Sequence, residues 1–151
     1  MAQTTLATSS RNAVVEISTD GSTWTDISGY AQSVSPGDGT RLTGTAHTFD
    51  GNGPIIVAGK LDAQESTVSI LYTEDTNGAY DRCRTAFDSS NSTLYLRVSP
   101  NGNTSGNYRH TSGKGVITQF PAFHELDASS GDPQMIEFTV KHGGFTRATI
   151  P

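Results

Sequence analysis

The sequence predicts a mainly β protein, an antiparallel β-sandwich or barrel of about eight or nine strands with one α-helix on its flank. Three observations indicate this fold class. Apolar and polar side chains alternate with a period of two along much of the chain, the alternating segments are separated by turns rich in Gly, Asn, Asp and Pro, and only one stretch has helical periodicity. The length of 151 residues fits a single domain that spans 1–151.

The first elements are predicted to be a hairpin and a short strand. The hairpin joins residues 13–18 to residues 23–27 through Asp20-Gly21, a pair that tolerates the positive backbone angles of a tight turn. A third strand is expected at 30–35, before a turn that contains Pro and Gly.

Residues 40–60 are predicted to project as an arm. The extended segment 41–49 is polar on both faces, and a Gly-rich bend separates it from Ile55, Ile56 and Val57, the most apolar triplet of the chain. Exposed loops with apolar side chains are usually contact surfaces. A second interpretation stays open, in which the triplet is a short core strand.

The next strand is expected at 65–73, and later strands follow from the same alternation. They are predicted at 93–99, 108–111, 115–120 and 134–141. In the two longest strands, one side faces the core and the other side points outward. The outward side chains are Glu65, Thr67 and Ser69 in the first, and Glu137, Thr139 and Lys141 in the second.

The one predicted helix covers 77–88. Tyr80, Cys83 and Phe87 fall at the helical spacings i, i+3 and i+7, and Asn77 is a candidate N-cap. On that face, Cys83 is interpreted as a small core residue, because no His stands near it in sequence and no other feature marks a reactive thiol.

Catalytic and metal-binding patterns are weak in this sequence. The four His are spread over different segments without a metal-ligand spacing, and no nucleophile elbow or phosphate loop occurs. His124, Glu125 and Asp127 could form a metal site at one loop, but a solvated loop explains them better. The sequence therefore predicts a protein that is not an enzyme and that binds no cofactor or metal.

Charge and hydropathy exclude further classes of protein. The net charge is −5 and Lys and Arg form no cluster, which disfavours adhesive binding to nucleic acid. No apolar run approaches the roughly 18 residues of a membrane span. Residues 1–11 lack the pattern of a signal peptide and Cys83 is the single cysteine, so we expect folding in a reducing cytoplasm.

Four stretches, taken together and in this order, carry a family resemblance. They are Val15 to Gly29, Leu42 to Gly51 with Ile55 to Lys60, Leu94 to Pro100 and Ser129 to Pro133, which read VEISTDGSTWTDISG, LTGTAHTFDG with IIVAGK, LYLRVSP and SSGDP. With them, the chain resembles the major tail tube proteins of long-tailed, siphovirus-type bacteriophages over nearly its whole length.

The resemblance implies a β-sandwich that assembles into rings, usually of six copies, stacked into a hollow tail. The implied partners are copies of the same chain and other tail proteins, such as the tape measure and the terminator. Double-stranded DNA would pass through the tube without specific binding. The implied location is the virion, with synthesis in the cytoplasm of the bacterial host.

The resemblance also implies roles for particular residues. The arm 40–60 would reach the neighbouring ring, with Phe49, Ile55, Ile56 and Val57 as apolar anchors. The termini 1–12 and 144–151 are candidates for bridging subunits, although frayed ends are the commoner outcome. The candidate side chains that face the lumen are Glu65, Thr67, Ser69, Glu137 and Thr139.

Two other functions remain as alternatives. A carbohydrate-binding or receptor-binding β-sandwich would use Trp24, Tyr95 and Tyr108 as stacking platforms. A capsid decoration protein would share the fold and the compartment, but it would assemble on shells instead of by itself.

Overall fold

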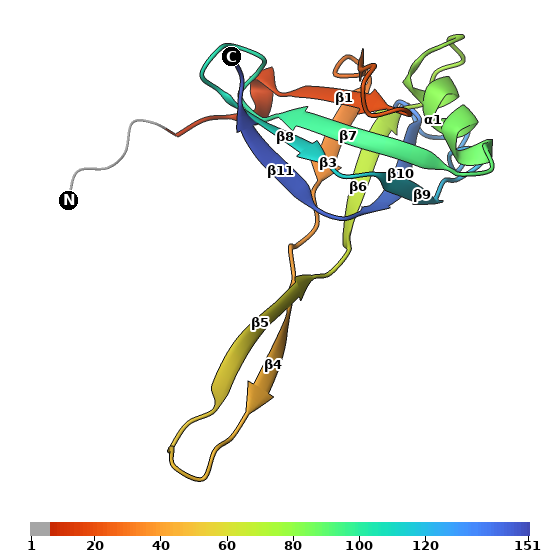
Figure 1. Cartoon of the computed structure of the whole chain (residues 1–151). Helices are drawn as coiled ribbons and strands as arrows, with labels where there is room; N and C mark the ends of the chain where they lie inside the picture. The colour runs from red at the N-terminus through yellow and green to blue at the C-terminus, as the bar shows by residue number, and fades with distance from the viewer. Residues whose placement is uncertain (1–6) are drawn as a thin grey trace.

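Two layers of antiparallel strands enclose the core, and a long hairpin leaves them at one end (Figure 1). The computed structural model describes residues 7–151, which form eleven strands, one α-helix and the 3-10 helix Ser10–Asn12. The first layer contains β1 (Val14–Ser18), β2 (Thr25–Asp26), β7 (Thr93–Ser99), β8 (Tyr108–Ser112) and β11 (Phe145–Thr149). The second layer contains β3 (Ala31–Ser35), β6 (Gln64–Leu71), β9 (Gly115–Gln119) and β10 (Met135–His142).

Strand β7 connects the two layers. Its first residues, Thr93 and Leu94, pair with β9, whereas Arg97 and Val98 pair with β8. Its other edge pairs with β1 along five residues, Ser18 lying opposite Tyr95. The predicted fold class, a mainly β antiparallel sandwich or barrel with one helix, is confirmed, with eleven strands in residues 7–151 in place of the expected eight or nine.

The core is built where β6 and β10 pair. Ile70 lies opposite Ile136 and Val68 opposite Phe138, and all four side chains are fully buried. Each such burial is worth about 1.5 to 3 kcal/mol relative to an exposed side chain. The alternation in the sequence therefore places an apolar inner face and a polar outer face on this pair of strands.

The helix α1 (Ala79–Asp88) closes one end of the sandwich and buries Ala79, Cys83 and Ala86. The expected cap at Asn77 is wrong. Gly78 is the N-cap residue, and Asn77 adopts a positive φ of 64° while its backbone N–H donates to Asp81 Oδ2 at 2.9 Å. Asp81, the acidic residue in the first turn, thus accepts a hydrogen bond from the backbone N–H of the residue that the sequence pattern had suggested as the cap.

The last segment of the chain is a strand, which the sequence analysis did not predict. Strand β11 runs antiparallel to β8, with Phe145 opposite Ser112 and Thr149 opposite Tyr108. Phe145 packs against the core, and Ile150 is 8% exposed. Residues 145–150 therefore pair with β8 and pack on the core of the same chain. Of the expected bridging segment 1–12, residues 1–6 lie outside the described residues.

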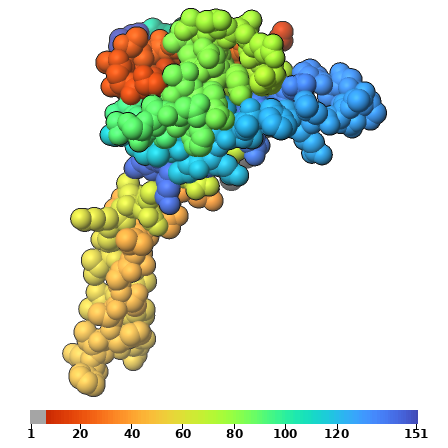
Figure 2. Space-filling model, turned by 90° about the vertical axis from the view of Figure 1, so that its right-hand side faces the viewer, coloured from red at the N-terminus to blue at the C-terminus, as the bar shows by residue number. Residues whose placement is uncertain are grey.

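Strands β4 (Arg41–Ala46) and β5 (Ile55–Leu61) form a separate two-stranded sheet, which is the projecting hairpin. Figure 2 shows it as a narrow column that extends from the body of the molecule. Within residues 7–151, the structure holds no helix with the length and apolar character that a membrane span requires.

Candidate functional site

The projecting hairpin, residues 40–62, is called the arm from here on. Every residue of β4 and β5 is exposed, and at a rise of about 3.3 Å per residue the seven residues of β5 span roughly 23 Å. Phe49 at the tip is fully exposed, and Ile55, Ile56 and Val57 are 52%, 67% and 61% exposed. The triplet is thus part of the arm, and its alternative placement in a core strand is wrong.

Pairing between β4 and β5 decides which side chains share a face of the arm. Ala46 lies opposite Ile55 and Gly44 opposite Val57, so Ile55 and Val57 share one face. Ile56 lies opposite Thr45, on the other face. The large apolar side chains of the arm are therefore spread over both of its faces and its tip, which suits an element that inserts between surfaces.

A buried hydrogen-bond network fixes the root of the arm. Ser66 Oγ donates to the carbonyl oxygen of Pro36 at 2.9 Å and lies 2.8 Å from Nε2 of His142. The Nδ1 atom of His142 accepts from the N–H of Gly144 at 3.0 Å, so the ring proton is on Nε2 and donates to Ser66. Burial lowers the pKa of His142, which keeps the imidazole neutral.

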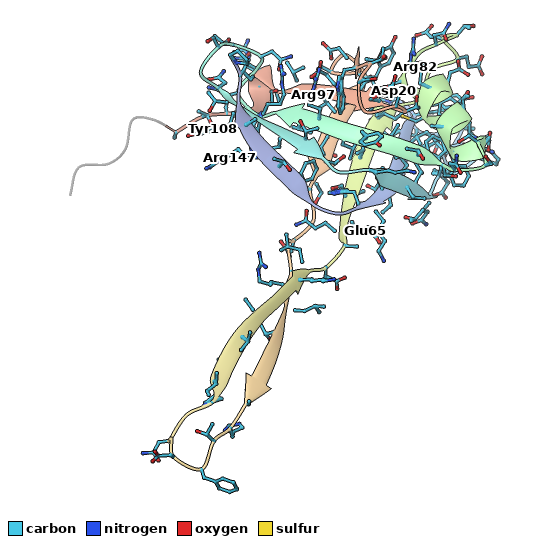
Figure 3. The ribbon with its side chains drawn as sticks, in the orientation of Figure 1. Asp20, Glu65, Arg82, Arg97, Tyr108 and Arg147 are labelled. Carbon is cyan, nitrogen blue, oxygen red and sulfur yellow. The ribbon has the colours of Figure 1, made fainter. Side chains whose placement is uncertain are left out.

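A close backbone approach reinforces this junction. Gly37 has a φ of 68°, and a Cβ atom there would lie 2.1 Å from the carbonyl oxygen of Glu65. Only glycine fits such a position. The entry of the chain into the arm and its exit are thereby held against each other, next to Glu65 (Figure 3).

The outer face of the second layer is polar. The residues that the sequence pattern placed on the outward side of the two longest strands lie together on this face. Glu65 lies opposite Lys141, Thr67 opposite Thr139, and Ser69 opposite Glu137, so all six share one face. Glu65 and Glu137 are exposed, while the small side chains of Ser69 and Thr139 are only 9% and 8% exposed. This surface is called the polar sheet face.

Sequence reasoning omitted three residues from this face and left a fourth, Lys141, out of the candidates for the lumen. Ser33 lies opposite Ser69 and Ser35 opposite Thr67, and Gln119 lies opposite Thr139. Lys141 had been placed on the outward side but not among the candidates, and its position opposite Glu65 leaves a net charge of −1 from two carboxylates and one ammonium. The alternation within each strand could have identified these side chains as outward. It could not show which strands lie next to each other, because that depends on strand pairing.

The other candidate residues, a possible reactive thiol and possible metal ligands, do not form a site. Cys83 is fully buried, and burial raises the pKa of its thiol to about 12. His124, Glu125 and Asp127 lie on the long loop 120–134, where Asp127 Oδ1 accepts hydrogen bonds from Ser129. Among residues 7–151, no three His, Cys, Asp or Glu side chains lie close enough to hold a metal ion.

Two of the three aromatic side chains of the carbohydrate-binding alternative, Trp24 and Tyr108, stack with cations of the same chain. The guanidinium of Arg97 lies 4.2 Å from the centre of the Trp24 ring, and that of Arg147 lies 4.6 Å from the Tyr108 ring (Figure 3). Arg97 also donates two hydrogen bonds of 2.7 Å to the carboxylate of Glu16. Stacked cations occupy one face of Trp24 and of Tyr108, which weakens the case for sugar-stacking platforms.

Comparison with known proteins shows what this chain is similar to. No protein-family model matches the sequence, and no curated protein matches it either. Solved structures do match it over nearly the whole chain. A chain of the sheath–tube complex of PVC, an extracellular contractile injection system, in its extended state is 14% identical with a TM-score of 0.74, covering 97% of this chain and 94% of that one.

Two further structures come from other assemblies. A chain of the tube-terminating cap of the anti-feeding prophage is 15% identical with a TM-score of 0.67, covering 99% of this chain and 94% of that one. A chain from the tail of an empty gene transfer agent particle, refined with C6 symmetry, is 12% identical with a TM-score of 0.64, covering 96% of this chain and all of that one. At these identities the likeness establishes a shared fold.

Proposed function

We propose that this chain is a structural protein that assembles with copies of itself into stacked rings, which form the tube of a phage or phage-like tail. The observation that carries the proposal is the arm, an element with exposed apolar side chains on both faces and at its tip. An isolated two-stranded hairpin is marginally stable in water. Its exposed apolar surface is therefore best explained by burial against other molecules.

The shared fold supports the choice of a tube over other assemblies. The similar structures come from a sheath–tube complex, a tube-terminating cap and the tail of a gene transfer agent. They include contractile systems, so the proposal covers tail tubes with and without a sheath. The remaining expectations are part of it: location in the virion, synthesis in the host cytoplasm, and a tape measure and a terminator as partners.

The polar sheet face is the proposed lining of the lumen. If six copies each contribute the four strands of the second layer, a barrel of roughly 24 strands at 4.8 Å spacing and 40° tilt has a backbone diameter of about 48 Å. Side chains narrow the bore by roughly 10 Å, which still admits a double helix. Hydroxyl groups and a small net negative charge would let DNA slide, since adhesion depends on phosphate neutralisation by cations.

The proposal is tested with the purified full chain at increasing concentration. We expect light scattering to rise above a critical concentration, and negative-stain electron microscopy to show rings and tubes of uniform diameter. A protein that stays monomeric under all associating conditions, or that assembles only on capsid shells, would contradict the proposal. The second outcome would instead favour a decoration protein.

A further inference from the structure

The arm and a separate depression lie at opposite ends of the second layer. Strand β3 enters the arm after Ser35, and β6 leaves it at Gln64, which pairs with His142 of β10. At the other end of the same strands, Ala31 pairs with Ile70, and Leu71 pairs with Met135. The eight residues of β6 separate the two ends by roughly 26 Å.

The depression at the far end is called the end pocket. It has a volume of about 540 Å³, and its apolar lining includes Tyr30, Ala31, Leu71 and Met135, with Pro133 at its margin. Tyr30 and Ala31 pack against the core from one side, and the backbone N–H of Leu71 donates to the carbonyl oxygen of Tyr30 at 2.8 Å. The walls of the pocket are therefore held in place by the sheet itself.

The margin of the end pocket is acidic. Asp132 lines it and also lines an adjoining hollow with Glu125 and Asp127. The loop that carries these three carboxylates, residues 120–134, contains no Lys or Arg. This loop stands out sideways from the body, separate from the arm (Figure 2).

The root of the arm offers the complementary surface. Leu42 and Leu61 are 56% and 58% exposed there, and Arg41 and Lys60 carry positive charges on the two strands of the arm, with Asp38, Asp62 and Glu65 as their acidic neighbours. Arg41 Nη1 donates to the carbonyl oxygen of Gly59 at 2.9 Å. This hydrogen bond holds the guanidinium of Arg41 at the root of the arm. Apolar side chains and cations at one end of the molecule thus match an apolar pocket with an acidic margin at the other end.

We infer that the end pocket of one copy receives the arm root of the next copy, with Leu42 and Leu61 over the apolar lining and Lys60 against Asp132. Complementary patches at opposite ends of one chain produce a heterologous, head-to-tail contact, which repeats without closing along an axis. The inference rests on the proposed function and adds to it the surface that receives the root of the arm. It also fixes the polarity of stacking, because every arm then points toward the end pocket of its neighbour.

Cysteine cross-linking tests this contact directly. One preparation carries Lys60→Cys and the other carries Asp132→Cys, and the two are mixed under assembly conditions with a mild oxidant. Disulfides require Cα atoms within about 7 Å, a distance that residues 60 and 132 of one chain cannot reach across the length of β6. We expect a disulfide-linked dimer in the mixture. The native Cys83 is fully buried and does not compete.

The controls separate this inference from the proposed function. Ser105→Cys, on an exposed residue of the loop between β7 and β8, replaces Lys60→Cys in a matched mixture and should give no dimer with Asp132→Cys. Tubes that form without a link between positions 60 and 132 would overturn the inference and leave the proposed function standing. Absence of tubes from the unmodified chain would overturn both.

A charge exchange gives an independent readout. Lys60→Glu and Asp132→Lys should each raise the critical concentration about threefold to tenfold, and the double variant should return it to near the original value. Single variants with an unchanged critical concentration would contradict the pairing of these two side chains.

Discussion

Replacing Ile55 and Ile56 together by Asp tests whether the arm drives assembly. These two side chains are 52% and 67% exposed and point to opposite faces of the arm, so the double change removes an apolar contact from each face. Because neither side chain is buried in the single chain, the variant should fold as the unmodified protein does. Surface changes of this kind alter the free energy of unfolding by about 0.5 kcal/mol or less.

The expected effect on assembly follows from the exposed fractions. Complete burial of an Ile side chain is worth about 1.5 to 3 kcal/mol, and half to two thirds of each side chain is available for burial in a contact. The two residues together then contribute about 2 to 4 kcal/mol for each subunit that joins the tube. This corresponds to a critical concentration about 30-fold to 1,000-fold higher in the variant.

The assay is sedimentation of assembled material over a concentration series, with negative-stain electron microscopy of the pellet and circular dichroism of the supernatant. The matched control is Ile55→Val with Ile56→Val, which keeps β-branched apolar side chains and should still assemble. An Asp variant that is folded and forms long tubes at the original critical concentration would refute the reasoning.

Three further predictions concern the body of the molecule. Arg97→Ala should lower the free energy of unfolding by about 3 kcal/mol in a denaturant titration, because it leaves the carboxylate of Glu16 buried without its cation; a loss under 0.5 kcal/mol would contradict this. Stability should fall as the pH drops from 7 to 5, because the pKa of His142 is lowered in the folded state and the unfolded chain gains a proton first. His142→Gln should flatten this dependence in thermal melts, and an unchanged slope would argue against it. Tubes of Glu65→Lys with Glu137→Lys should retain DNA at low salt and release it at high salt, whereas equal retention by unmodified tubes would contradict a lumenal position.

Local patterns in the sequence were sufficient to predict whether most segments form a strand or a helix. Strand β7 begins and ends where the alternation predicted, at Thr93 and Ser99, and the face of α1 that carries Cys83 is buried as expected. Such features depend on side chains that are close in sequence, so the period of two or of 3.6 residues reveals them. The outward position of Glu65 and Glu137 was predicted by the same means.

Features that depend on pairing between distant segments could not be predicted in this way. Strand β11 is polar and short, and it is a strand because β8 offers it an open edge. The projection of residues 40–60 was predicted, but the sequence left open whether Ile55, Ile56 and Val57 belong to the arm or to a core strand, because the pattern does not record what covers apolar side chains.

The sequence by itself determined a mainly β chain with one helix, a polar outer face on its longest strands and an apolar segment near residue 55, because each of these is written in the order of neighbouring side chains. Only the tertiary structure decided that Lys141 lies opposite Glu65, that Ser66 joins the two ends of the arm and is held by His142, and that the arm and the end pocket occupy opposite ends of the same strands. These are contacts between residues far apart along the chain, and they exist only when strand register has brought the residues together.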